Sequence, residues 1–277
     1  MEPVPVLRAV GLRKRFGGLT AVDGVSLDVH ANEVVGIVGD NGAGKSTLIK
    51  MISGVYKPDE GEVSLDGQKM MLNDPREARR LGIETIYQDL ALADNLDVGS
   101  NVFLGREVLK PFIGRLVTTL DRKRMREESA AVLDRLGIHI PTLTQPIRNL
   151  SGGQRQAVAI ARAIYWNVRL MILDEPTAAL GVSEQQKVLK LVRTLRDQGV
   201  AVIIISHNMQ DVFAVADRIV VMRRGAKVGE LKTAQTKVDE IVGLMVGVEA
   251  VGHPAAVLEG DGANPGTEEE GLRAIES

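Results

Sequence analysis

The chain contains the stretch Glu33-Val-Val-Gly-Ile-Val38, followed directly by Gly39-Asp-Asn-Gly-Ala-Gly-Lys-Ser-Thr47. The first part favours a buried β-strand, and residues 46–53 have the pattern of a helix. Between them, Gly39, Gly42 and Gly44 let backbone N–H groups approach phosphate oxygens where a Cβ would obstruct them. The positive end of the helix points to the same place. This order of strand, loop and helix predicts a phosphate-binding loop in an α/β fold.

Two side chains of this loop are suited to bind phosphate and a metal ion. Lys45 supplies a positive charge for the β- and γ-phosphates of a nucleotide, and Ser46 supplies a hydroxyl for Mg²⁺. Asn41, Ala43 and Thr47 complete the stretch that surrounds the phosphates. The alternative is a glycine turn that binds nothing, but the strand before it and the helix after it favour the phosphate loop. We therefore expect ATP and Mg²⁺.

A second apolar strand, Leu170-Met-Ile-Leu173, ends in two acids. Ligands of open α/β sheets bind at the C-terminal ends of the strands. We expect Asp174 to hold Mg²⁺, partly through water, and Glu175 to act as general base toward an attacking water. Either acid alone is equally consistent with a solvated strand end. The pair together with a phosphate loop favours the catalytic interpretation.

A third motif, Leu150-Ser-Gly-Gly-Gln154, begins a helix predicted over residues 153–166. Ser151 is a good N-cap, and the glycines allow a tight entry into the helix. The same hydroxyl and the amides beside it, at a helix N-terminus, also form a second anion-binding surface.

The three motifs together resemble the ATP-binding-cassette (ABC) ATPases, and the resemblance runs from about Val6 to about Leu231. It implies an α/β fold of the P-loop NTPase type, with a RecA-like parallel sheet core, an antiparallel β edge and a helical subdomain insert. It also implies that Ser151, Gly153 and Gln154 contact a nucleotide held by a second copy of the chain. Two ATP molecules are then sandwiched between two cassettes.

Three further residues acquire a role only from this resemblance. Phe16 matches the aromatic residue that stacks on adenine, usually a tyrosine, although a lone phenylalanine beside a strand is more often part of a core. Gln88 matches the glutamine that touches Mg²⁺ and the catalytic water. His207 matches the histidine that contacts the γ-phosphate, although a histidine at a strand end is usually just hydrogen-bonded.

One stretch departs from the family pattern. ABC cassettes commonly have Ser-Ala-Leu-Asp where this chain has Ala178-Ala-Leu-Gly181, and Gly181 cannot supply the interface carboxylate. This variant and the stretches 86–92 and 101–107 resemble cassettes of monosaccharide importers of the ribose, xylose and fructose kind. The stretch 14–22 also resembles cassettes of branched-chain amino-acid importers, so both solute classes remain open.

Alternating strand and helix patterns predict how the chain is organised. We expect residues 1–87 and 167–235 to form the ATP-binding core and residues 88–166 a helical subdomain. Residues 236–248 should form a terminal helix, and residues 249–277, rich in Gly, Ala, Pro and Glu, a disordered tail. The apolar residues within 89–105 either form a groove for a partner's helix or pack the insert onto the sheet, and the sequence leaves both open.

Composition narrows the possible partners. Among 277 residues, 34 Lys and Arg balance 36 Asp and Glu, which gives no bulk attraction to nucleic acid. The absence of cysteine fits a reducing cytosol. The longest apolar run, residues 200–205, is far shorter than the roughly 20 residues of a membrane-spanning helix. The first five residues lack the basic and apolar regions of a signal peptide.

We therefore expect the ATP-hydrolysing subunit of an importer, peripheral at the cytoplasmic face of the inner membrane. The implied partners are a second copy of the chain, separate transmembrane permease subunits and, indirectly, an extracytoplasmic solute-binding protein, but no nucleic acid. A soluble ABC ATPase acting on ribosomes or DNA would usually carry two cassettes or a long coiled-coil insert, with basic arms, and none of these is visible. A non-hydrolysing regulatory cassette would be expected to lack Lys45 or Glu175, and both are present.

Overall fold

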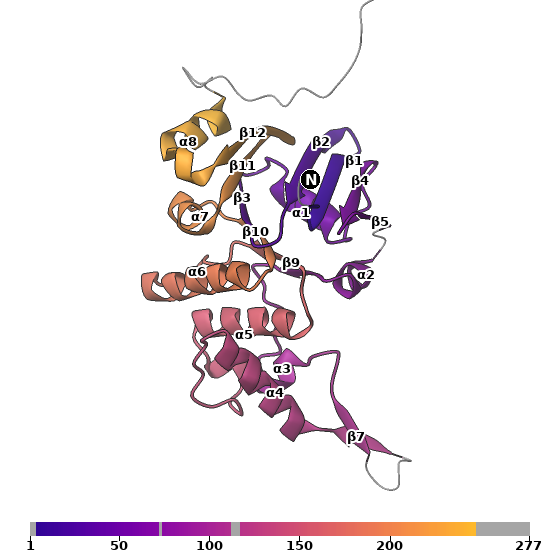
Figure 1. Ribbon diagram of the computed structural model, residues 1–277, viewed down its shortest axis with the longest axis vertical. Helices are drawn as coiled ribbons and strands as arrows, with labels where there is room; N and C mark the ends of the chain where they lie inside the picture. The colour runs from indigo at the N-terminus through magenta and orange to yellow at the C-terminus, as the bar shows by residue number, and fades with distance from the viewer. Residues whose placement is uncertain (1–3, 72–73, 112–116, 248–277) are drawn as a thin grey trace, which may run out of the picture.

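The structure of the protein, a computed structural model, describes residues 4–71, 74–111 and 117–247 (Figure 1). The tail predicted to be disordered, residues 249–277, lies outside the described residues.

A six-stranded sheet forms the centre of the molecule, in the order β12-β11-β3-β10-β9-β6. Five of its strands are parallel, and β12 pairs antiparallel with β11 at one edge. Successive residues of these strands enter two different apolar clusters: Ile203 packs on one face and Ile204 on the other. Strands buried on both faces explain the continuous apolar runs. The strands are β3 (Val34–Val38), β6 (Ile83–Ile86), β9 (Leu170–Asp174), β10 (Ala201–Ile205), β11 (Arg218–Arg223) and β12 (Ala226–Lys232).

A second, fully antiparallel sheet covers one face, with strands in the order β2-β1-β4-β5. Helix α1 (Lys45–Ile52) lies between the two sheets, and its Leu48 and Ile49 are buried in the same apolar cluster as both (Figure 1). The helix that follows the phosphate loop is therefore held from two sides. The strands are β1 (Leu7–Phe16), β2 (Leu19–Val29), β4 (Glu60–Leu65) and β5 (Gln68–Met70).

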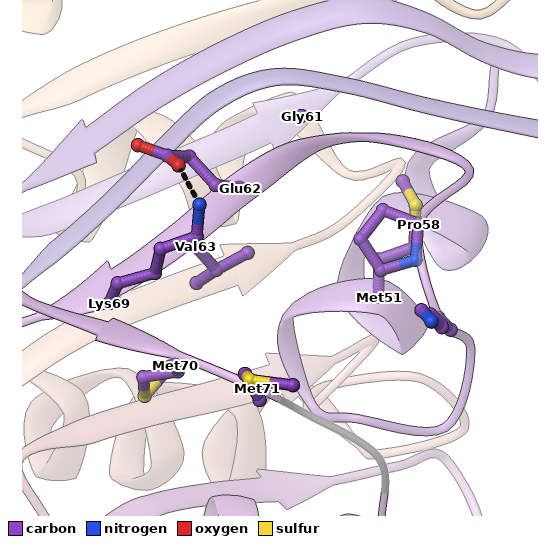
Figure 2. A pocket seen from close by; sticks show the side chains of 9 residues that line it. Met51, Pro58, Gly61, Glu62, Val63, Lys69, Met70 and Met71 are labelled. Carbon is purple, nitrogen blue, oxygen red and sulfur yellow. Dashed lines mark hydrogen bonds and ion pairs between the residues drawn. The ribbon is translucent and has the colours of Figure 1, made fainter.

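A small cavity of about 130 Å³ lies beside this second sheet, between the C-terminal end of α1 and the strands β4 and β5. Figure 2 shows the side chains of Met51, Met70 and Met71 around it, and the ion pair between Lys69 and Glu62 at one side. None of the residues predicted to bind a nucleotide lines this cavity.

Helices cover the other face of the central sheet, and the insert extends beyond them. In Figure 1, α3, α4 and the hairpin of β7 and β8 lie at the end of the molecule opposite α8. The helix predicted over residues 153–166 agrees with α5, but the hairpin and the short helices α2, α3 and α7 were missed because they are too short for a periodic pattern. These elements are α2 (Pro75–Arg80), α3 (Val98–Val102), β7 (Leu109–Pro111), β8 (Thr118–Leu120), α4 (Arg122–Arg135), α5 (Gly152–Tyr165), α6 (Val182–Asp197), α7 (Met209–Val215) and α8 (Val238–Val246).

Three apolar residues of the stretch 89–105 do not line a groove for a partner. Val98, Val102 and Phe103 are completely buried in the apolar core of the insert, so here packing is the correct alternative. Asn101 is equally buried, and its side-chain amide makes four hydrogen bonds that hold the loop before α3. Within the described part of the chain, no helix has both the length and the apolar character needed to cross a membrane.

Candidate nucleotide site

A cavity of about 780 Å³ lies at the C-terminal edge of the central sheet, where β3, β9 and β10 end. It collects most of the predicted site residues from distant parts of the sequence. Gly39 does not line it, although its carbonyl oxygen accepts a hydrogen bond from Lys45. Ser151, Gly153 and Gln154 also lie outside it. The predicted residues that do line the cavity are Phe16, Asn41, Gly42, Ala43, Gly44, Lys45, Ser46, Thr47, Gln88, Asp174, Glu175 and His207.

Close backbone packing explains two glycines of the phosphate loop. Gly39 has φ +150°, and a Cβ there would lie 2.2 Å from the carbonyl oxygen of Met222. Gly44 has φ +99°, and a Cβ there would lie 2.4 Å from the carbonyl oxygen of Ala21. Neither position accepts a side chain. These glycines are thus required by contacts with β11 and β2 as well as by the approach of a phosphate.

The ammonium of Lys45 is held by its own loop. Its Nζ donates hydrogen bonds to the carbonyl oxygens of Gly39 at 2.6 Å and Asp40 at 3.0 Å. Burial lowers the pKa of Lys45, and the negative charges of Glu175 and Asp174 partly offset this effect. A phosphate entering the loop would therefore meet a cation that is already positioned.

Asp174 is an acid in an unfavourable environment. Burial, and then repulsion from Glu175, raises the pKa of Asp174, while Lys45 lowers it in part. The described residues contain no group of three or more His, Cys, Asp or Glu side chains that could hold a metal ion by themselves. Mg²⁺ suits such a site, because it commonly binds through one or two carboxylates together with substrate phosphates and water. A cation beside Asp174 would also relieve the cost of burying its charge.

Glu175 and His207 are in direct contact at the wall of the cavity. The backbone N–H of His207 donates to Oε1 of Glu175 at 3.1 Å, and Nδ1 of His207 lies 2.8 Å from Oε2. The second contact lacks hydrogen-bond geometry, so Oε2 is a buried oxygen without a donor. Glu175 also has φ +51°, a costly conformation for a residue with a side chain. Strain and an unpaired buried oxygen at one residue are typical of a functional position.

A hydrogen bond that sequence reasoning missed joins the loops carrying these two residues. The hydroxyl of Thr177 donates to Oδ2 of Asp211 at 2.6 Å, and the two residues are only 3% and 4% exposed. Thr177 follows Glu175 by two positions, and Asp211 lies in the first turn of α7, just after His207. No local pattern could have revealed the pair, because 34 residues separate its members.

Phe16 lies at the rim of the cavity and is 43% exposed, so it is not a core residue. Its ring contacts Tyr56 edge to face, with 5.3 Å between the centroids. The ammonium of Lys14 also lies over the ring, 5.7 Å from its centroid, so a flat ligand would use the part of the ring that remains exposed.

The turn that begins α5 is a complete capping box. The N–H of Gln154 donates to the hydroxyl of Ser151, and the N–H of Ser151 donates to the side-chain oxygen of Gln154. Gly152 packs so closely on Leu180 that a Cβ would lie 2.6 Å from its side chain. In a single chain this turn does not reach the phosphate loop, and its role toward a second copy stays a prediction.

Comparison with known proteins identifies the family. Residues 22–178 match the sequence model of the ABC transporter family, which is more than half of the chain. The chain is 50% identical over 234 residues to the xylose/arabinose import ATP-binding protein XylG of Sulfolobus acidocaldarius, covering 84% of this chain and 91% of the relative. It is 45% identical over 251 residues to the fructose import ATP-binding protein FrcA of Rhizobium meliloti, covering 90% and 96%. The ribose import ATP-binding protein RbsA 1 of Streptomyces avermitilis is 42% identical over 242 residues, covering 87% of this chain and 45% of the relative.

Solved structures of ATP-binding cassettes agree with this family assignment. An ATP-binding cassette of an ABC transporter in its ADP conformation superposes with a TM-score of 0.73 at 28% identity, covering 88% of this chain and 96% of that one. The dimeric structure of a bacterial ABC transporter cassette superposes with a TM-score of 0.67 at 28% identity, covering 82% and 98%. The chain therefore belongs to the ABC transporter family and is one of its ATP-binding cassettes.

Proposed function

We propose that this cassette hydrolyses ATP to drive the import of a monosaccharide. The observation that carries the proposal is the identity of 50% and 45% to ATP-binding proteins of xylose/arabinose and fructose import, over 84% and 90% of the chain. The phosphate loop and both acids line one cavity, which supports hydrolysis at this site. These similarities favour a sugar over the branched-chain amino acids that residues 14–22 left open.

Nucleotide binding rests on the loop and the aromatic rim. The backbone N–H groups of residues 41–47 surround the phosphates, and Lys45 exchanges its hydrogen bonds to Gly39 and Asp40 for phosphate oxygens. Phe16 stacks on the adenine with its exposed face. The cavity volume of about 780 Å³ falls in the usual range of roughly 300–1,000 Å³ for small-molecule sites.

Mg²⁺ would be held by Ser46, Gln88 and Asp174, which all line the cavity, together with phosphate oxygens. When bound, the ion neutralises charge that develops on the transferred phosphoryl group. Asp174 would keep its negative charge beside the ion, although burial disfavours that charge when no cation is present.

Glu175 is the proposed general base. Its Oε2 is buried and has no hydrogen-bond donor among the described residues, so it can accept a proton from water near the γ-phosphate. His207 is fixed to Glu175 through its backbone N–H, and its exposed imidazole, which lies beside the same carboxylate, is the proposed contact to the γ-phosphate. The residue proposed as general base and the residue proposed to contact the γ-phosphate therefore hold each other in position.

The proposed assembly has two copies of the chain, with Ser151, Gly153 and Gln154 of each contacting the nucleotide of the other. A dimeric cassette structure of the same fold supports this arrangement. We further propose that the dimer acts on separate transmembrane permease subunits at the cytoplasmic face of the membrane. An extracytoplasmic solute-binding protein would deliver the sugar to them.

The first test is Glu175→Gln. The variant should bind ATP like the parent, lose at least about 99% of the hydrolysis rate because a general base contributes roughly 10²–10⁴-fold, and accumulate as a dimer with ATP in size-exclusion chromatography. The matched control is Glu127→Gln on the exposed surface of α4, which should behave like the parent. Hydrolysis at the parental rate would show that Glu175 is not the base.

The solute is tested by uptake. Cells lacking the chain, supplied with either the parent or the Glu175→Gln variant, are given labelled xylose, fructose, ribose or leucine. Restoration of uptake of one sugar by the parent alone supports the proposal. Restoration of leucine uptake alone would refute the sugar assignment while leaving the ATPase intact.

A further inference from the structure

Arg224 lies at the rim of the nucleotide cavity, and none of the roles above uses it. It lines the cavity together with Phe16 and the phosphate loop, and it is exposed. Its guanidinium forms no hydrogen bond or ion pair with any residue in the described ranges. An arginine at a ligand cavity with all five N–H donors available is prepared to bind an anion.

The backbone conformation at Arg224 is unfavourable for a long side chain, which indicates that this side chain has a function. Arg223 of β11 pairs with Ala226 of β12, which leaves Arg224 and Gly225 as a two-residue hairpin turn. Both have positive φ, +48° and +85°, the pattern of a type I′ turn. The first position of this turn favours Asn, Asp or Gly, and a long side chain is strained there. The turn alone would be more stable with another residue.

The turn is also fastened to the phosphate loop. The N–H of Gly225 donates to the carbonyl oxygen of Ala43 at 3.0 Å, and its carbonyl oxygen accepts from the N–H of Asp23 at 2.9 Å. The Cα of Gly225 lies 3.3 Å from the position of a Cβ on Gly44. Arg224 is therefore held one residue away from the loop that surrounds the phosphates.

Without Arg224, the acidic side chains that line the cavity outnumber the basic ones. Among the side chains that line it, Lys45 is opposed by two acids, Asp174 and Glu175. Without Arg224 the protein would present a net negative site to a polyphosphate. With it, the lining charges balance before any metal ion binds.

We propose that the guanidinium of Arg224 pairs with the polyphosphate of the bound nucleotide, as a second cation beside Lys45. The inference rests on the nucleotide site proposed above. A guanidinium can hold two phosphate oxygens at once, which a lysine cannot do with the same geometry. Arg224 therefore contributes affinity and orientation to the nucleotide and takes no part in the chemical step.

The test compares Arg224→Asn with Arg223→Asn by calorimetric titration of ADP with Mg²⁺. Asparagine suits the turn, so Arg224→Asn should keep or raise the melting temperature while the Kd for ADP rises about two- to fivefold. The rise of Kd with salt should also become shallower than in the parent, because one charge pair is lost. Arg223 lines a neighbouring cavity beside α8, which Arg224 and residues 41–43 also border, but it does not line the nucleotide cavity, so its variant should bind ADP like the parent. Arg224→Lys should recover part of the affinity.

An unchanged Kd for Arg224→Asn would overturn the inference, and so would an equal loss of ADP affinity in Arg223→Asn. In both cases, binding of ADP by the parent would still support the proposed nucleotide site. Failure of the parent itself to bind ADP would overturn the proposed function as well. A lower melting temperature together with weaker binding would also count against the inference, since it would assign the turn a structural role.

Discussion

Replacing Asn101 by alanine should destabilise the helical insert strongly. The side-chain amide donates to the carbonyl oxygens of Ala93, Leu96 and Asp97 at 3.1, 3.3 and 3.0 Å, and its oxygen accepts from the N–H of Ala93 at 2.7 Å. The amide nitrogen has only two hydrogens for its three acceptors, so the side chain makes about three full bonds; at about 1 kcal/mol net each, their loss should lower the free energy of unfolding by about 3 kcal/mol. At about 2–4 °C for each kcal/mol, the melting temperature should fall by about 6–12 °C.

The assay is thermal unfolding followed by circular dichroism and by tryptophan fluorescence. Trp166, the single tryptophan, ends α5 and packs its ring on Phe103 with 6.0 Å between the centroids, so it reports on the insert directly. The control is Asn95→Ala in the same loop, an exposed side chain with no hydrogen bond in the structure, which should change the melting temperature by less than about 2 °C. A similarly small change for Asn101→Ala would refute the hydrogen-bond argument.

Three other substitutions test the site. Asp174→Asn should stabilise the nucleotide-free protein by about 0.5–2 kcal/mol at neutral pH, because burial and Glu175 raise the pKa of Asp174 and its charge is costly. The gain should vanish as the pH falls to the ordinary aspartate range, where the parent is also protonated; a gain in denaturant unfolding that persists there would contradict this explanation. Thr177→Val should lower kcat about tenfold with little change in KM, and Thr177→Ser should not; equal effects would show that the hydroxyl bonded to Asp211 is unimportant. Gly39→Ala should abolish measurable ATP binding because its Cβ would lie 2.2 Å from a backbone oxygen, whereas Gly199→Ala, with φ +96° and open space around it, should bind ATP normally; parental affinity in Gly39→Ala would reject the packing argument.

Local patterns predicted the parts of the molecule that local forces build. The strand, loop and helix around Gly39–Thr47 and the strand ending in Asp174 were correct, because apolar runs and glycine positions carry that information over a few residues. The helices α1 and α5 agree with the predicted ranges, residues 46–53 and 153–166, within one residue at each end. The short hairpin of β7 and β8 was not foreseen, because two strands of three residues have no distinctive pattern.

Side-chain environments were harder to foresee than elements. Phe16 had two interpretations, and its exposure at the cavity rim decides against the core. The apolar residues within 89–105 also had two, and the complete burial of Val98, Val102 and Phe103 decides for packing at those three positions. In each case the sequence supplies a residue type, but exposure depends on which distant segment packs over it.

The sequence by itself determined the family and the parallel core and predicted the phosphate loop and the two acids, because neighbouring residues carry each of these patterns. Only the tertiary structure decided that Glu175 faces His207, that Thr177 bonds Asp211 and that Arg224 stands beside the phosphate loop. These are contacts between side chains brought together by the order β11-β3-β10-β9 in the central sheet. Strand order arises from the packing of the whole core, so no local stretch of the chain contains it.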